Sequence, residues 1–171
     1  MTTAPDAAPS TPNGKAGDRI VWIDCEMTGL DLGSDALVEV ACVVTDADLR
    51  ELDAGVTVVI RPPDAPFAAM PDIVREMHTA SGLIEEIPHG TTLEAAEALV
   101  LDYVRSHCPD PRKAPLAGSS VYVDRGFIAR DMPTHTVGND KKADVRIGGM
   151  AVFVAGAPQT GIGANGPRDG D

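Results

Sequence analysis

The stretch WIDCEMTGL, residues 22–30, ends an apolar strand-like run on two carboxylates and a Thr-Gly turn. Asp24 and Glu26 are two positions apart, so in a strand both side chains point to the same face. Like charges so close together are costly unless cations lie between them. Taken alone, such a pair is more often a solvated strand edge. The apolar run that leads into it and the turn that follows it favour a functional site instead.

The segments around this stretch predict a sheet covered by helices. Residues 19–25, 36–46 and 55–61 are rich in Val and Ile, and the short Gly/Asp connections between them predict an antiparallel meander. Thr91-x-x-Glu94 is a capping box, and the apolar residues after it recur at helical spacing until a proline ends the run. We therefore expect a mixed α/β domain.

A third carboxylate, Asp124, follows a short apolar run over residues 115–121. Its simplest role is the N-cap of a helix that begins near Asp124 and ends before Pro133. That role is compatible with a second one, because Asp124 together with Asp24 and Glu26 would make an oxygen-rich set. Mg²⁺ and Mn²⁺ are hard cations that prefer such ligands.

Length and charge limit the possible functions. A chain of 171 residues is long enough for one domain with a substantial core. The net charge of −12 argues against a protein that wraps a long nucleic acid, because such binding depends on basic side chains that neutralise phosphates. Any nucleic-acid substrate should therefore be short, and held by metal ions and a few specific contacts.

The N-terminal segment and the cysteines indicate the compartment. Residues 1–18 contain no basic start followed by an apolar stretch, so they predict a flexible arm rather than a signal peptide or membrane span. Cys25, Cys42 and Cys108 form no C-x-x-C pair and are expected to be small buried side chains. We therefore expect a cytoplasmic protein with no membrane partner.

The composition changes after Pro133. Residues 134–171 contain no Leu and no Glu, but eight of the 17 glycines. This predicts an atypical, disordered tail that follows a domain spanning residues 19–133. Only residues 150–157 are apolar enough for a short strand, and the alternative is that they add an edge strand and complete an altered domain.

Three segments resemble the oligoribonucleases, members of the DEDD exonuclease superfamily with a ribonuclease H-like fold. They are WIDCEMTGLD, MHTASGLIEEI and GSSVYVDRGFIARDMP, which match in order and spacing between residues 19 and 133. The resemblance implies an α/β fold with a ribonuclease H-like mixed sheet, antiparallel first three strands and flanking helices. It also implies hydrolysis of very short oligoribonucleotides from the 3′ end, giving nucleoside 5′-monophosphates by a two-metal mechanism.

The same resemblance implies roles for individual residues. Asp24, Glu26 and Asp124 would be three of four carboxylates that bind catalytic Mg²⁺ or Mn²⁺.

The substrate-binding residues implied by the resemblance are Leu30, His78 and Ser120. Leu30 would wedge against a terminal base, His78 would line the substrate pocket, and Ser120 would reach a phosphate. The simpler alternatives are a surface leucine, a histidine that caps a turn and a hydroxyl on a buried strand.

The sequence departs from the family after Pro133. The family continues with a helix that carries a general-base His and, five residues later, the fourth metal-binding Asp. His135 is the only histidine after Pro133, and Asp140, five residues later, lies in no helical pattern. We therefore expect the domain to be C-terminally incomplete, with this part missing or frame-shifted. Activity and the family's homodimer would then be impaired, and the alternative function is a non-catalytic product that at most binds metal or nucleotide weakly.

Overall fold

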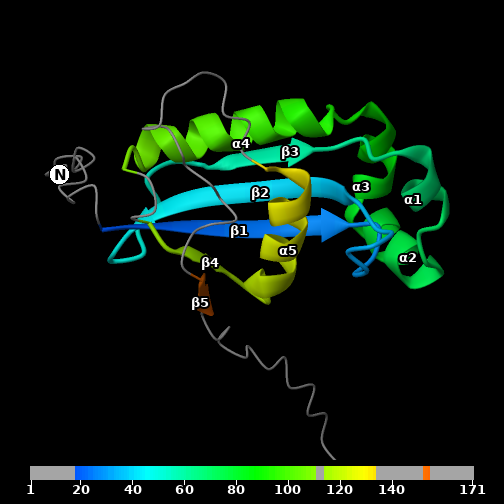
Figure 1. Ribbon diagram of the computed structural model, residues 1–171, viewed down its shortest axis with the longest axis horizontal. Helices are drawn as coiled ribbons and strands as arrows, with labels where there is room; N and C mark the ends of the chain where they lie inside the picture. The colour runs from blue at the N-terminus through cyan, green and yellow to red at the C-terminus, as the bar shows by residue number, and fades with distance from the viewer. Residues whose placement is uncertain (1–17, 111–113, 134–151, 155–171) are drawn as a thin grey trace, which may run out of the picture.

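The computed structural model describes residues 18–110 and 114–133, and the backbone of residues 152–154. Five strands form one sheet in the order β3-β2-β1-β4-β5 (Figure 1). Within these ranges no helix has both the length and the apolar character needed to cross a membrane. The elements are β1 (Arg19–Met27), β2 (Leu37–Asp46), β3 (Val56–Val59), α1 (Asp64–Ala68), α2 (Asp72–Ser81), α3 (Leu83–Glu86), the 3₁₀-helix η1 (Ile87–His89), α4 (Leu93–His107), β4 (Leu116–Gly118), α5 (Val121–Asp131) and β5 (Val152–Val154).

The pairing of the strands confirms the predicted sheet. β1, β2 and β3 are antiparallel neighbours, whereas β4 pairs with β1, and β5 with β4, in parallel. Strand β5 lies inside the apolar segment 150–157, as the edge-strand alternative expects. The rest of the tail predicted over residues 134–171, and the arm predicted over residues 1–18 apart from Asp18, lie outside the described residues.

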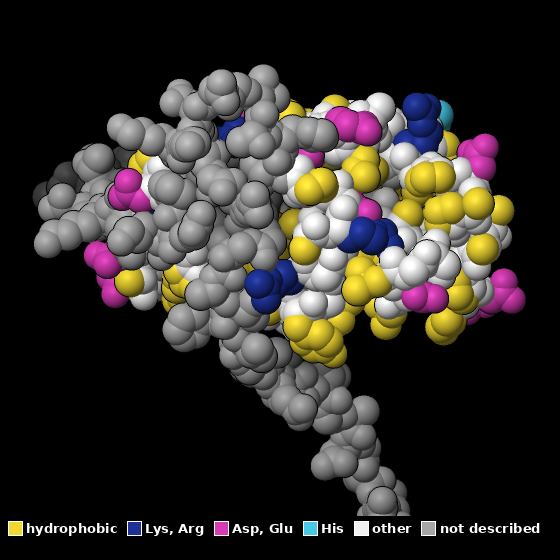
Figure 2. Space-filling view, viewed as in Figure 1, with side chains coloured by type: hydrophobic (Ala, Val, Ile, Leu, Met, Phe, Trp, Pro, Cys, Tyr) yellow, Lys and Arg dark blue, Asp and Glu magenta, His cyan; other side chains and the backbone are white. Residues whose placement is uncertain are grey.

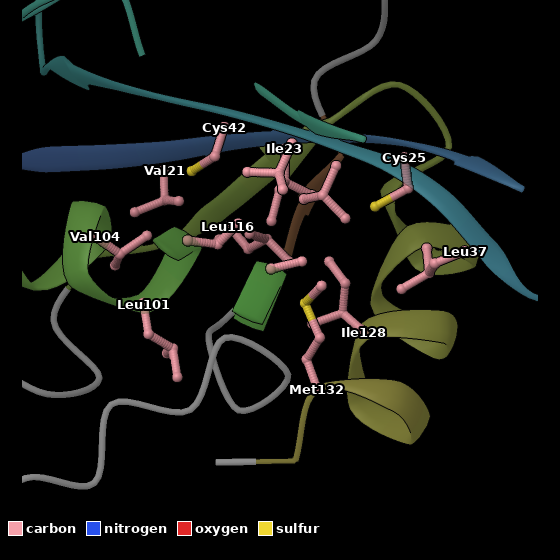
Figure 3. Close-up of a cluster of buried hydrophobic side chains, with 14 of the residues drawn as sticks. Val21, Ile23, Cys25, Leu37, Cys42, Leu101, Val104, Leu116, Ile128 and Met132 are labelled. Carbon is pink, nitrogen blue, oxygen red and sulfur yellow. The ribbon is translucent and has the colours of Figure 1, made fainter. Parts of the chain in front are cut away.

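The main hydrophobic core lies between one face of the sheet and the helices α4 and α5 (Figure 3). Alternate residues of β1 point into it, because successive side chains of a strand point to opposite faces. All three cysteines are buried and unpaired, as predicted. The cluster includes Val21, Ile23 and Cys25 of β1, Val100 and Val104 of α4, and Phe127 and Ile128 of α5.

A second, smaller cluster lies at the end of the sheet toward which β1 runs, where α1, α2 and α3 gather (Figure 1). The register of β1 and β2 shifts there, since Glu26 pairs with Glu39 but Met27 pairs with Leu37. The extra residue, Val38, joins the second cluster instead of the main core. This bulge and its cluster bring α2 beside the carboxylate-bearing end of β1.

The predicted start of α4 is wrong by one residue, and that of α5 by about three. The N-cap of α4 is Thr92, whose hydroxyl accepts a hydrogen bond from the Ala95 amide at 3.3 Å. Thr91 was expected in that position, but its backbone instead forms a bridge to Ile60, the residue after β3. Helix α5 starts at Val121, so Asp124 is not its N-cap and lies within its first turn.

A close approach of strands explains the early start of α5. A Cβ at Gly118 would lie 2.4 Å from the Ile23 carbonyl oxygen, so only glycine lets the end of β4 lie this near β1. The chain then turns through Ser120, whose φ of 52° is left-handed, directly into the helix. Tertiary packing therefore sets this boundary.

Candidate active site

Asp24 and Glu26 lie near the end of β1. Burial alternates along the strand, so Ile23 and Cys25 point into the main core while Asp24 is exposed and Glu26 is half-buried. The pleat therefore turns both carboxylates to the face of the sheet away from α4.

Asp124 is hydrogen-bonded to the backbone of β1 between those two carboxylates. Its Oδ1 accepts a hydrogen bond from the Cys25 amide at 3.2 Å, although the two residues are 99 positions apart. The Asp124 side chain is only 4% exposed. Burial, followed by the charges of Asp24 and Glu26, raises the pKa of Asp124 to about 6. The three carboxylates are therefore close enough for the charges of Asp24 and Glu26 to act on Asp124.

His78 lies on α2 and is fully buried behind the site. Its Nε2 is 2.9 Å from the Met27 carbonyl oxygen, which can only accept, so Nε2 carries the proton. Its Nδ1 is 3.9 Å from Glu26 Oε2, and this contact becomes an ion pair only if the imidazole is protonated. His78 does not cap a turn. It supports the strand end and faces Glu26.

Leu30 and Ser120, the other two substrate-binding candidates, lie at the surface. Leu30 is 75% exposed in the loop that follows β1. Ser120 is exposed at the start of α5, which excludes the alternative of a hydroxyl on a buried strand.

The sequence prediction did not include Glu39. It is the cross-strand partner of Glu26 on β2, so the two side chains lie on the same face of the sheet. Burial, and then the charges of Glu26, Glu86 and Asp24, raise the pKa of Glu39. The sequence pattern could have indicated Glu39, because it is the single charged residue inside the apolar run of residues 37–44.

A groove of about 470 Å³ lies on the sheet beside Asp24. Its volume is within the size range of small-molecule sites. On the face drawn in Figure 2, the Lys and Arg side chains of the described residues form separate spots rather than a continuous stripe. The groove is lined by Trp22, Ile23, Asp24, Ala41, Cys42, Val43, Glu51, Ala54, Val56, Thr57, Gly118 and Ser119.

The donors fit a hard divalent cation in their chemistry. Asp24, Glu26 and Asp124 offer only oxygen atoms. The pKa of Asp124 is raised by burial first and then by the charges of Asp24 and Glu26, and a bound cation would offset that repulsion. Their arrangement is more open than a complete ligand set. Among the residues that the structure describes, no three His, Cys, Asp or Glu side chains are arranged to hold one metal ion.

Comparison with known proteins identifies a family. The profile of the family described as Exonuclease (RNase T) matches residues 21–151 of this chain. The chain is 64% identical over 115 residues to the oligoribonuclease of Streptomyces avermitilis, and 59% identical over 118 residues to that of Mycobacterium tuberculosis H37Ra. These alignments cover 67% and 68% of this chain, but only 58% and 55% of the relatives. The chain thus spans little more than half the length of these curated relatives.

Solved structures agree on the fold. A product-bound exonuclease I aligns with a TM-score of 0.55 at 14% identity, over 80% of this chain and 30% of that one. Exonuclease I of E. coli in complex with a dT13 oligonucleotide aligns with a TM-score of 0.50 at 17% identity, over 67% of this chain and 24% of that one. At such low identity the likeness establishes the ribonuclease H-like α/β fold alone.

Proposed function

The chain belongs to the exonuclease family whose profile covers most of it, and from this we propose that it hydrolyses very short oligoribonucleotides from the 3′ end. The products would be nucleoside 5′-monophosphates. One observation carries the proposal: the Asp124 carboxylate is hydrogen-bonded to the backbone between Asp24 and Glu26. The oligoribonuclease relatives supply the substrate class.

In this proposal Asp24, Glu26 and Asp124 would hold Mg²⁺ or Mn²⁺. Such ions, when bound, supply an activated water and stabilise the leaving 3′-oxygen. His78 supports the strand end that presents Glu26, since it holds the Met27 carbonyl and lies 3.9 Å from the Glu26 carboxylate.

The substrate would be held by surface residues around these carboxylates. Leu30 offers an apolar side chain to a terminal base, and Ser120 offers a hydroxyl to a phosphate at the start of α5. The net charge of −12 repels a long polyanion, which favours a substrate with few phosphates.

We expect this activity to be low. Within residues 134–171, no His followed five residues later by an Asp lies in a helical pattern of the kind that the resemblance implies for the general base and the fourth carboxylate. A positioned general base typically contributes about 10²–10⁴-fold to the rate. The second candidate is therefore a non-catalytic chain that binds metal or nucleotide weakly, and the open arrangement of the carboxylates favours it.

Hydrolysis of the diribonucleotide ApA by the purified chain in Mn²⁺ distinguishes the two candidates. We expect slow release of nucleoside 5′-monophosphate, lost in the Asp24→Asn and Asp124→Asn variants. Asp102→Asn is the matched control, because Asp102 is 79% exposed on α4. No release above background would favour the non-catalytic candidate. Release within about tenfold of an intact relative would refute the expected impairment, since it implies a substitute general base, with His135 the first residue to mutate.

A further inference from the structure

The loop between β1 and β2, residues 28–36, carries Leu30, and we call it the Leu30 loop. Hydrogen bonds join its residues to one another. Asp35 is the centre of its network. One carboxylate oxygen accepts from the Thr28 hydroxyl at 2.9 Å, and the other accepts from the Asp31 amide at 2.9 Å. The Thr28 hydroxyl in turn accepts from the Ala36 amide at 3.0 Å. The loop therefore has a defined shape of its own.

Arg130 of α5 holds this loop from outside. Its guanidinium donates to the carbonyl oxygen of Leu32, and to that of Asp35 at 2.8 Å. The guanidinium is itself fixed in two ways. It donates to the Asp131 carboxylate at 2.6 Å, and it lies over the Phe127 ring at 4.9 Å from the ring centroid. Charge-assisted, multiply bonded contacts of this kind are stronger than neutral hydrogen bonds.

A second contact joins the same loop to the same helix. A Cβ at Gly126 would lie 3.1 Å from a methyl group of Leu32, so the Leu32 side chain rests on the helix where no side chain projects. Gly126 is two residues after Asp124 and four before Arg130. The Leu30 loop is thus docked on the helix that carries the third carboxylate.

Leu30 cannot hold this position by its own packing, because three quarters of its side chain is exposed. Resting on the proposed function, we propose that Arg130 is a positioning residue for the terminal nucleotide. It fixes the Leu30 loop to α5, so that the base-contacting Leu30 and the carboxylate of Asp124 keep one spacing before substrate arrives. Ordering a loop in advance removes that entropy cost from binding.

The test measures binding of ApA to the full chain by calorimetry, with Ca²⁺ as the divalent ion. Arg130→Met removes both bonds to the loop carbonyls but keeps an apolar stem over Phe127. We expect binding to weaken on the order of tenfold, as for the loss of a charge-assisted contact, and Arg130→Lys to recover part of it. Arg105→Met, the same substitution at an α4 residue paired with Asp102, is the control and should bind like the parent.

A double-mutant cycle separates positioning from general stability. If Arg130 acts through Leu30, Arg130→Met should have little further effect on ApA binding in a Leu30→Ala background. Mn²⁺ affinity, which depends on the carboxylates, should stay the same in Arg130→Met. Additive losses in the cycle, or an equal loss of Mn²⁺ affinity, would overturn the positioning role.

Amide hydrogen exchange tests the docking of the loop without any substrate. We expect faster exchange in residues 31–36 of Arg130→Met, and unchanged exchange in α4. Unchanged exchange in the loop would overturn the inference on its own, whatever the binding results. If the parent chain binds no ApA at all, the proposed function fails and the role of Leu30 fails with it, whereas the exchange result still decides whether Arg130 holds the loop.

Discussion

Replacing Asp124 with Asn should stabilise the metal-free protein at neutral pH. Asp124 is almost fully buried beside Asp24 and Glu26, and its pKa is raised from 3.8 to about 6. The folded state therefore binds the Asp124 proton more tightly than the unfolded state does. This favours folding below pH 4, and the advantage is lost as the pH rises through the folded pKa.

The size of the effect follows from the shift. A difference of about two pKa units, at about 1.4 kcal/mol each, makes ionised Asp124 cost roughly 3 kcal/mol above pH 7. Near pH 4.5 the cost is about 1 kcal/mol by the same linkage. Asn removes the titration but keeps a side-chain oxygen that can accept from the Cys25 amide, as Asp124 does at 3.2 Å. The gain in the free energy of unfolding should therefore grow between pH 4.5 and 7.5.

Urea unfolding in EDTA and a reductant measures this gain at several pH values. Trp22, the single tryptophan, reports on β1, where its indole donates to the Thr45 hydroxyl at 3.0 Å. Asp102→Asn serves again as the exposed control, and its effect should not follow the same pH curve. Added Mn²⁺ should stabilise the parent but not Asp124→Asn, since only a folded site binds the ion. A variant that is less stable than the parent at pH 7.5, or a gain that does not change with pH, would refute the electrostatic reasoning.

The remaining predictions concern the metal, a helix cap and the partly buried hydroxyl of Tyr103. Calorimetric titration with Mn²⁺ should detect at most one weakly held ion and none in Asp24→Asn, whereas two tightly held ions would contradict the open site. Thr92→Ala should lower the free energy of unfolding by about 1 kcal/mol and Thr91→Ala by less, and the reverse order in urea unfolding would contradict the assigned cap. Tyr103→Phe should lower the free energy of unfolding by about 1–2 kcal/mol, because the Tyr103 hydroxyl donates to Asp53 at 2.8 Å and accepts from a backbone amide of β2. An unchanged urea midpoint would show that water replaces the lost hydroxyl.

Local patterns in the sequence were sufficient for the first three strands, for the presence of α4 and α5 and for the family, whereas the helices α1, α2, α3 and η1 were not predicted. Alternating burial along β1 follows from a two-residue period, so the shared face of Asp24 and Glu26 could be predicted from their spacing. The antiparallel order of the first three strands followed from their short connections. The predicted helix starts were wrong where neighbours decide them, as at Thr92 and at the turn through Ser120.

Contacts between distant residues were decided by the tertiary structure. The bond from the Cys25 amide to Asp124, and those from Arg130 to the Leu30 loop, join residues more than 90 positions apart, and no local pattern encodes such pairs. Glu39 faces Glu26 because the antiparallel register of β1 and β2 pairs the two residues, one position before the bulge. Local sequence sets which way a side chain points along its own strand or helix, whereas packing between elements sets which side chains meet. The sequence by itself therefore determined the carboxylates that could act, and only the folded chain determined what holds and surrounds them.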